Sequence, residues 1–118
     1  MSSVENISAW RDHDVVDPGG EKVGPLRVVY YDIDSDEPLF LGVETGMLRH
    51  RLSLLPVAGA KVGQNQIQVS SAKSQVDHAP AVELGAELSR DMEPRIFAHY
   101  DLPYVPGPTR SGRRLIRH

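Results

Sequence analysis

Asp32, Asp34 and Asp36 place carboxylates at alternate positions of one short run, an arrangement that opens calcium-binding loops. Such a loop also needs glycine at its sixth position for a sharp turn, and Glu37 stands there. Its twelfth position needs a glutamate that binds calcium through both oxygens, where this chain has Val43. We therefore interpret the run as a solvated acidic turn, and we predict no metal and no cofactor.

Histidine chemistry is the next possibility. The five histidines are scattered, without the short spacings of zinc ligands: His13, His50, His78, His99 and His118. His13 and Asp14 could act as the base and its orienting acid, but no serine lies in the context of a nucleophile elbow. The absence of cysteine excludes disulfides, thiolate metal sites and thiol nucleophiles. We therefore predict that the protein is not an enzyme.

Two further patterns favour structural interpretations. Gly19, Gly20 and Gly24 do not form a phosphate loop, because a strand rather than a helix is predicted after them. We interpret the basic run Arg49-His50-Arg51 as a solvated hairpin end rather than a binding patch.

Positive charge gathers at the C-terminal end of the chain. Four of the 13 basic residues and no acidic residue lie from Val105 onward, so the preceding part has 9 basic and 16 acidic residues, a net charge of −7. This acidic body argues against a nucleic-acid-binding face on the folded part. The candidate polyanion contacts are the four arginines of the tail: Arg110, Arg113, Arg114 and Arg117. We expect them to bind polyanions only weakly and with strong salt dependence.

The stretch from Gly20 to Thr45 predicts two strands that organise the rest of the chain. Residues 26–33 are rich in β-branched and aromatic side chains, and residues 39–45 alternate apolar side chains with others. The residues between them, 34–38, have the composition of a turn.

Two registers are open for the first of these strands. Strict alternation would bury Leu26, Val28 and Tyr30. A bulge at the proline of this strand would instead bury Leu26, Val29 and Tyr31. The residue pattern alone does not choose between them.

In the second strand, Leu39, Leu41 and Val43 predict the buried face, with Phe40 and Glu44 pointing outward. Further strands are predicted at Val15-Val16 and within residues 47–57 and 66–70, and one helical turn within residues 71–76. Short strands separated by frequent turn signals indicate a small antiparallel barrel or sandwich.

One helix is predicted between about Ser89 and Tyr100, near the C-terminal end. Its apolar side, together with the outward Phe40, forms a candidate protein interface: Phe40, Met92, Ile96, Phe97 and Tyr100. This side either folds back over its own sheet or packs across the twofold axis of a homodimer. The sequence does not choose between these two alternatives.

Composition and the N-terminal residues bear on location. The chain of 118 residues is 40% hydrophobic and 25% charged, as in ordinary globular domains. Its first residues have neither the basic nor the apolar region of a secretory signal, and no apolar run reaches membrane-spanning length. We expect a cytoplasmic protein without membrane insertion.

Four segments are predicted. Residues 1–12 form an N-terminal capping segment in which Trp10 plugs one end of the domain. Residues 13–80 form the β domain, residues 81–104 an extension with the helix, and residues 105–118 a basic, flexible tail.

The order and spacing of several motifs resemble the PRC-barrel family, typified by the cytoplasmic module of the photosynthetic reaction centre H subunit. The matching segments span most of residues 7–104 and are Asp17-Pro18-Gly19-Gly20-Glu21-Lys22-Val23-Gly24, Val29–Asp32, Leu39–Gly46, Leu54–Ala60, Val69–Pro80 and His99–Tyr104. The resemblance implies an SH3-like β-barrel, and it favours the register with Val29 and Tyr31 inward. Asp101 departs from the pattern, because glycine commonly ends the helix at this position.

The leading functional hypothesis is a non-enzymatic PRC-barrel protein that acts as a binding or assembly module for another macromolecule. The first alternative is an adaptor for RNA processing or ribosome assembly that uses the arginine tail. The second alternative is a small enzyme.

Overall fold

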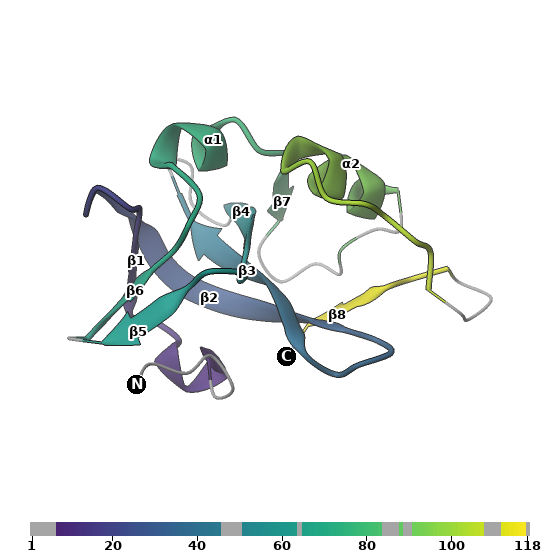
Figure 1. The fold of residues 1–118 in the computed structure, drawn as a ribbon, viewed down its shortest axis with the longest axis horizontal. Coiled ribbons are helices and arrows are strands. Elements are labelled where there is room, and N and C mark those ends of the chain that lie inside the picture. Colours follow the sequence, from purple (N-terminus) through teal and green to yellow (C-terminus); the bar gives the residue numbers. More distant parts are fainter. Residues whose placement is uncertain are drawn as a thin grey trace.

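β2 (Lys22–Asp32) is the longest strand and the centre of the structure (Figure 1). Its β-branched and aromatic side chains favour the extended backbone. β1 (Asp14–Val16) pairs with the first part of β2 and β8 (Leu115–Arg117) with its last part, while β3 (Pro38–Glu44) pairs antiparallel along it.

The computed structural model describes residues 7–45, 51–63, 65–83, 88, 91–107 and 112–117. The other strands of this part are β4 (Arg51–Pro56), β5 (Lys61–Gly63), β6 (Gln66–Gln68) and β7 (Ala81–Glu83). Its helical elements are the 3-10 helix η1 (Ile7–Trp10) and the α-helices α1 (Lys73–Asp77) and α2 (Met92–His99). The protein is mainly β, as the sequence predicts.

The described strands form one sheet in the order β5-β6-β1-β2-β3-β4-β7, with β8 paired to β2. β1 and β6 are parallel, whereas the other pairs are antiparallel. β5 and β7 are the two edges of this sheet and do not pair with each other. The described strands therefore leave the sheet open and do not confirm a barrel.

The register of β2 takes one residue from each predicted alternative. Its pairing with β3 shifts between Leu26 and Val28, so a bulge is present and Val29 is buried. A second shift lies between Tyr30 and Tyr31. Tyr30 is buried, and Tyr31 is partly buried and packs against the core cluster, so Tyr30 is the more deeply buried of the two tyrosines.

Both faces of β3 are covered, which corrects the prediction that Phe40 points outward. Phe40 and Leu41 are both buried, although successive side chains of a strand point to opposite faces. The Phe40 ring packs against Phe97 of α2, with ring centroids 5.0 Å apart. The prediction failed because it left one face of the strand to solvent.

The apolar side of α2 lies against its own sheet rather than on the surface. Ile96, Phe97 and Tyr100 are buried in the core cluster, and Met92 is partly buried against it. The five predicted interface residues are thus internal contacts of this chain. α2 lies within the range predicted for the helix, and α1 overlaps the helical turn predicted within residues 71–76. The helix is not the C-terminal element, because β8 follows α2.

Residues 115–117, which lie in the predicted flexible tail, form strand β8. β8 pairs with residues 30–32 of β2, and Leu115 is buried in the core. The ion pairs of Arg114 with Asp32 and Asp34 neutralise part of the basic charge on which the prediction rested.

Candidate functional site

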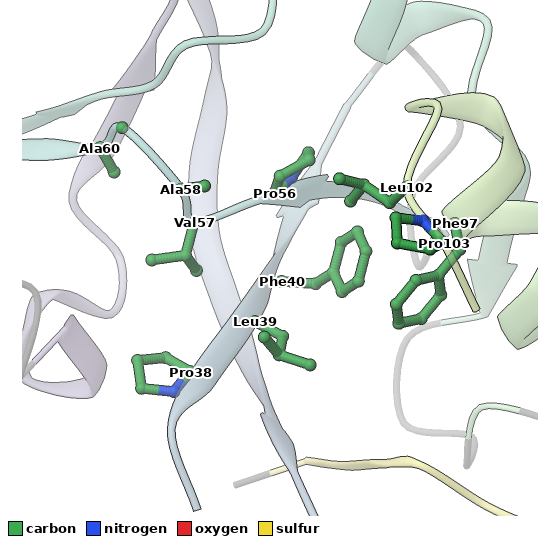
Figure 2. A pocket seen from close by; sticks show the side chains of 11 residues that line it. Pro38, Leu39, Phe40, Pro56, Val57, Ala58, Ala60, Phe97, Leu102 and Pro103 are labelled. Atoms are coloured by element: carbon green, nitrogen blue, oxygen red, sulfur yellow. The ribbon is translucent and has the colours of Figure 1, made fainter. Parts of the chain in front are cut away.

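An apolar pocket of about 390 Å³ lies where three segments of the chain meet (Figure 2). Its volume falls near the lower end of the usual range for ligand sites, roughly 300–1,000 Å³. The three segments are the start of β3, the connection from β4 to β5, and the end of α2 with the residues after it. They supply eleven lining residues: Pro38, Leu39, Phe40, Pro56, Val57, Ala58, Gly59, Ala60, Phe97, Leu102 and Pro103.

Aromatic rings hold the inner end of the pocket in place. Phe97 lies edge-on to Phe40 and also to Tyr104, each at a centroid distance of 5.0 Å. Phe40 and Phe97 are only 1% and 6% exposed. These rings are therefore part of the core, and they present a rigid apolar surface to whatever enters the pocket.

The end of α2 places Leu102 beside Phe97. Asp101 takes a left-handed conformation with φ of 56°. The backbone N–H of Leu102 donates to the carbonyl of Phe97 at 2.9 Å, and that of Asp101 to Ala98 at 3.1 Å. This pair of bonds is a Schellman motif, which brings together the residues that flank the helix end. The motif thus builds one wall of the pocket from Phe97 and Leu102.

The opposite wall is a tight connection fixed by backbone bonds. The N–H of Val57 donates to the carbonyl of Leu39 at 2.9 Å, and the N–H of Ala60 donates to Val57 at 2.8 Å. Gly59, with φ of 82°, supplies the left-handed residue of this turn. The Ser70 hydroxyl donates to the carbonyl of Ala58 at 2.9 Å and ties the turn to the chain after β6.

The lining determines what the pocket can do chemically. None of the eleven residues carries a titratable or nucleophilic side chain. The site can therefore exclude water and hold apolar groups, and its own lining offers no acid, base or nucleophile for catalysis.

Charged residues lie beside the lining rather than in it. Glu37 precedes Pro38, Asp101 precedes Leu102, and Lys61 follows Ala60, and all three charged residues are exposed. The pocket thus has two acids and one base as its immediate chain neighbours.

The acidic run Asp32–Asp36, which resembles the start of a calcium loop, contributes to an ion-pair network. Arg114 donates to the carboxylates of Asp32 at 2.7 Å and Asp34 at 3.1 Å, and its side chain is only 14% exposed. It also donates to the carbonyls of Val105 and Pro106. In the part of the chain that the structure describes, no group of three or more His, Asp or Glu residues is placed to hold a metal ion.

The three candidate polyanion contacts that the structure describes do not form one exposed patch. Arg114 is held by its acidic partners, and Arg113 donates to the carbonyl of Leu88. Arg117 lies in β8, and Arg110 lies outside the described residues. At least two of the arginines predicted to contact a polyanion, Arg113 and Arg114, therefore form contacts within the fold.

His13 and Asp14 have other partners than those expected of a catalytic base and its orienting acid. The His13 ring packs on Trp10 at a centroid distance of 4.9 Å, and Asp14 pairs with Lys22 at 3.3 Å. His78 and His99 each contact a backbone carbonyl. His50 and His118 lie outside the described residues.

Sequence reasoning missed two features. The first is the pocket. Its prolines, Pro38, Pro56 and Pro103, are typical of strand ends and turns, so the local sequence does not indicate that the three segments meet. Glu93 lies in the first turn of α2, where an acidic side chain is usually exposed, yet it is fully buried. Its carboxylate accepts bonds from the Tyr104 hydroxyl at 2.6 Å and from the N–H groups of Arg114 and Leu115.

Comparison of the chain with protein-family models and with curated proteins finds no match. Across the described residues, no helix has the length and apolar character required to cross a membrane.

Proposed function

We propose that this protein is a non-enzymatic binding module that holds an apolar segment of a partner protein in the pocket between β3 and α2. The observation that carries the proposal is the composition of that pocket, which is lined by aliphatic, aromatic and proline side chains on rigid elements. An apolar pocket on a fixed scaffold is the usual form of a protein site for apolar ligand groups.

We also propose that the fold is a member or close variant of the PRC-barrel type, with SH3-like strand connections. The antiparallel run β2-β3-β4, the bulge in β2 and the short strands around them support this assignment. The motif order described from the sequence supports it as well. The assignment agrees with a binding or assembly role, although the proposed binding site stands on the pocket alone.

Energetics favour a segment that inserts a few side chains. Each fully buried aliphatic side chain contributes about 1.5–3 kcal/mol, whereas association itself costs about 4–15 kcal/mol. A pocket of about 390 Å³ has room for only a few such groups. We therefore expect a weak affinity, between micromolar and millimolar, suited to a reversible assembly contact.

A peptide selection tests this proposal. A library of phage-displayed linear peptides would be panned against the intact chain, and the enriched peptides would be titrated by calorimetry. We expect peptides with clustered aliphatic residues, and we expect Leu102→Glu to weaken them by about tenfold or more because it places a charge in the pocket wall. Their binding should shift the amide resonances of Leu39, Val57 and Leu102.

Val105→Glu is the matched control. Val105 is 63% exposed and does not line the pocket, whereas Leu102 is 36% exposed and does. Both substitutions introduce the same charge on the segment after α2, and the control should leave the affinity unchanged. Failure to select any aliphatic peptide, or equal effects of the two substitutions, would overturn the proposal. So would tight RNA binding or self-association as the only activity found.

A further inference from the structure

The surroundings of the pocket carry information about the charge of its partner. Resting on the proposed function, we infer that the bound segment carries lysine or arginine directly beside its apolar residues. The inference comes from charge complementarity around the pocket, because two of the three charged residues that adjoin its lining are acidic.

The first acidic position is the turn before Pro38. Asp36 has φ of 59°, its N–H donates to the carbonyl of Asp32 at 2.8 Å, and the N–H of Glu37 donates to the Ser35 hydroxyl at 3.4 Å. The backbone of this turn is thus held by its own bonds. Asp36 and Glu37 are exposed and form no ion pair with a described residue, while the neighbouring Asp34 is paired with Arg114.

The second acidic position is the end of α2. The Schellman bonds fix the backbone of Asp101 next to the pocket wall, and its exposed side chain has no ion pair among the described residues. Lys61 adjoins the pocket at Ala60, in a different segment. A cationic residue of the partner is therefore expected near Glu37 or Asp101 and away from Lys61.

The charge of the whole molecule acts in the same direction. The chain has a formal net charge of −3 at pH 7, so it weakly attracts a cationic segment before contact is made. Individual exposed ion pairs are weak, because water and salt screen them. Their combined effect on affinity is expected to be about tenfold at low salt and small at high salt.

Three short synthetic peptides test the inference on the intact chain. They share one core of alternating proline and leucine and differ only in the residues that flank it, which are arginine, glutamine or glutamate. The glutamine peptide measures apolar binding alone and thus tests the proposed function. We expect the arginine peptide to bind about tenfold more tightly than the glutamine peptide, and the glutamate peptide to bind most weakly.

A pair of double variants locates the effect. Glu37→Gln with Asp101→Asn should remove most of the preference for arginine and leave the glutamine peptide unchanged. Asn is chosen at position 101 because it tolerates the left-handed conformation. Glu21→Gln with Asp91→Asn neutralises one Glu and one Asp that do not line or adjoin the pocket, and it should keep the preference.

The outcomes separate the two claims. Equal affinities of the three peptides, each weakened by Leu102→Glu, would overturn the inference and leave the proposed function standing. Absence of binding by all three would overturn both. An arginine preference that both double variants reduce equally would show general attraction to an acidic protein and overturn the inference.

Discussion

The carboxylate of Glu93 accepts the backbone N–H of Leu115 at 2.9 Å, across 22 residues of chain. Glu93 is fully buried, and Leu115 begins β8. The same carboxylate accepts the N–H of Arg114 and the Tyr104 hydroxyl. One side chain at the start of α2 therefore holds the segment that returns from the helix to the sheet.

Glu93→Gln is expected to destabilise the protein by about 2 kcal/mol, because bonds to a charged acceptor contribute about 1.5–3 kcal/mol and the new NH₂ group faces N–H donors. Urea unfolding measures the loss. Amide hydrogen exchange should show faster opening of β8 and of its partner residues 30–32 than of β3. Glu37→Gln, at an exposed position, is the control and should change stability little; an equal effect of both would show that Glu93 does not anchor β8.

Asp17 makes the stability of the protein depend on pH. Its carboxylate accepts the N–H of Glu21 at 2.8 Å, of Lys73 at 3.2 Å and of Gly19 at 2.9 Å. These bonds, led by that of Glu21, lower the pKa of Asp17 below its ordinary value of 3.8. A carboxyl group with a lowered pKa in the folded state stabilises the fold above the unfolded pKa, and this contribution is lost as pH falls through the folded pKa.

We therefore expect Asp17→Asn to be less stable than the wild type at pH 7 and to approach it in stability at low pH. Asn can still accept the bonds from Gly19 and Glu21, but its NH₂ group cannot accept that of Lys73. Urea unfolding across an acid series measures this convergence. A difference in stability between Asp17→Asn and the wild type that stays constant across the acid series would refute the linkage.

The buried hydroxyl of Tyr100 donates to the carbonyl of Leu54 at 2.6 Å and joins α2 to β4. Tyr100→Phe should cost about 1 kcal/mol at pH 7, because the carbonyl loses its donor. Burial raises the pKa of Tyr100 above its ordinary value of 10. The unfolded chain therefore ionises first as pH rises, and the wild type loses stability above about pH 10. The gap between the two proteins should narrow there in urea titrations; a gap that widens would contradict the prediction.

The strands could be predicted from the sequence where local pattern decides them. β2 and β3 follow their β-branched, aromatic and alternating residues, and the turn between them follows its Asp, Ser and Pro content. The burial of Phe40 could not be predicted, because it depends on Phe97, which lies in α2, far away in the sequence. Sequence alternation predicts that one face of a strand is exposed, and only the tertiary structure shows whether another element covers that face.

The pocket and β8 were missed for related reasons. Leu39, Val57 and Leu102 belong to three segments that only tertiary packing brings together. β8 is short, basic and preceded by Pro and Gly, so its composition indicated a tail. Its position depends on Glu93 and on Asp32 and Asp34, the ion-pair partners of Arg114, and none of these three residues is near β8 in sequence.

Asp101 ends α2 with a left-handed backbone that glycine adopts without strain. Asp101→Gly is therefore expected to stabilise the protein by about 0.5–1 kcal/mol, since Asp tolerates this conformation only in part. Thermal and urea unfolding measure the gain. Ala98→Gly, one turn earlier inside α2, is the control and should destabilise by about 1 kcal/mol. A loss of stability for Asp101→Gly would show that the Asp side chain contributes more than its backbone conformation costs.

Phe97 and Leu102 both line the pocket, yet they should respond very differently to a negative charge. Phe97 is 6% exposed and packs on Phe40, so Phe97→Asp buries an unpaired carboxylate and leaves a cavity. We expect a loss of about 4 kcal/mol or more, a large part of the stability of a small domain. Leu102→Asp, at a position 36% exposed, should cost less than about 1 kcal/mol.

Circular dichroism and urea unfolding distinguish these outcomes, and light scattering behind a sizing column gives the mass of each variant. If Phe97→Asp remained fully folded and lost mass relative to the wild type, α2 would lie at an interface between two copies rather than in the core of its own chain. If it unfolded while Leu102→Asp stayed folded, Phe97 would belong to the scaffold and Leu102 to the accessible wall. The second result is expected, because the Phe97 ring is already enclosed by Phe40 and Tyr104.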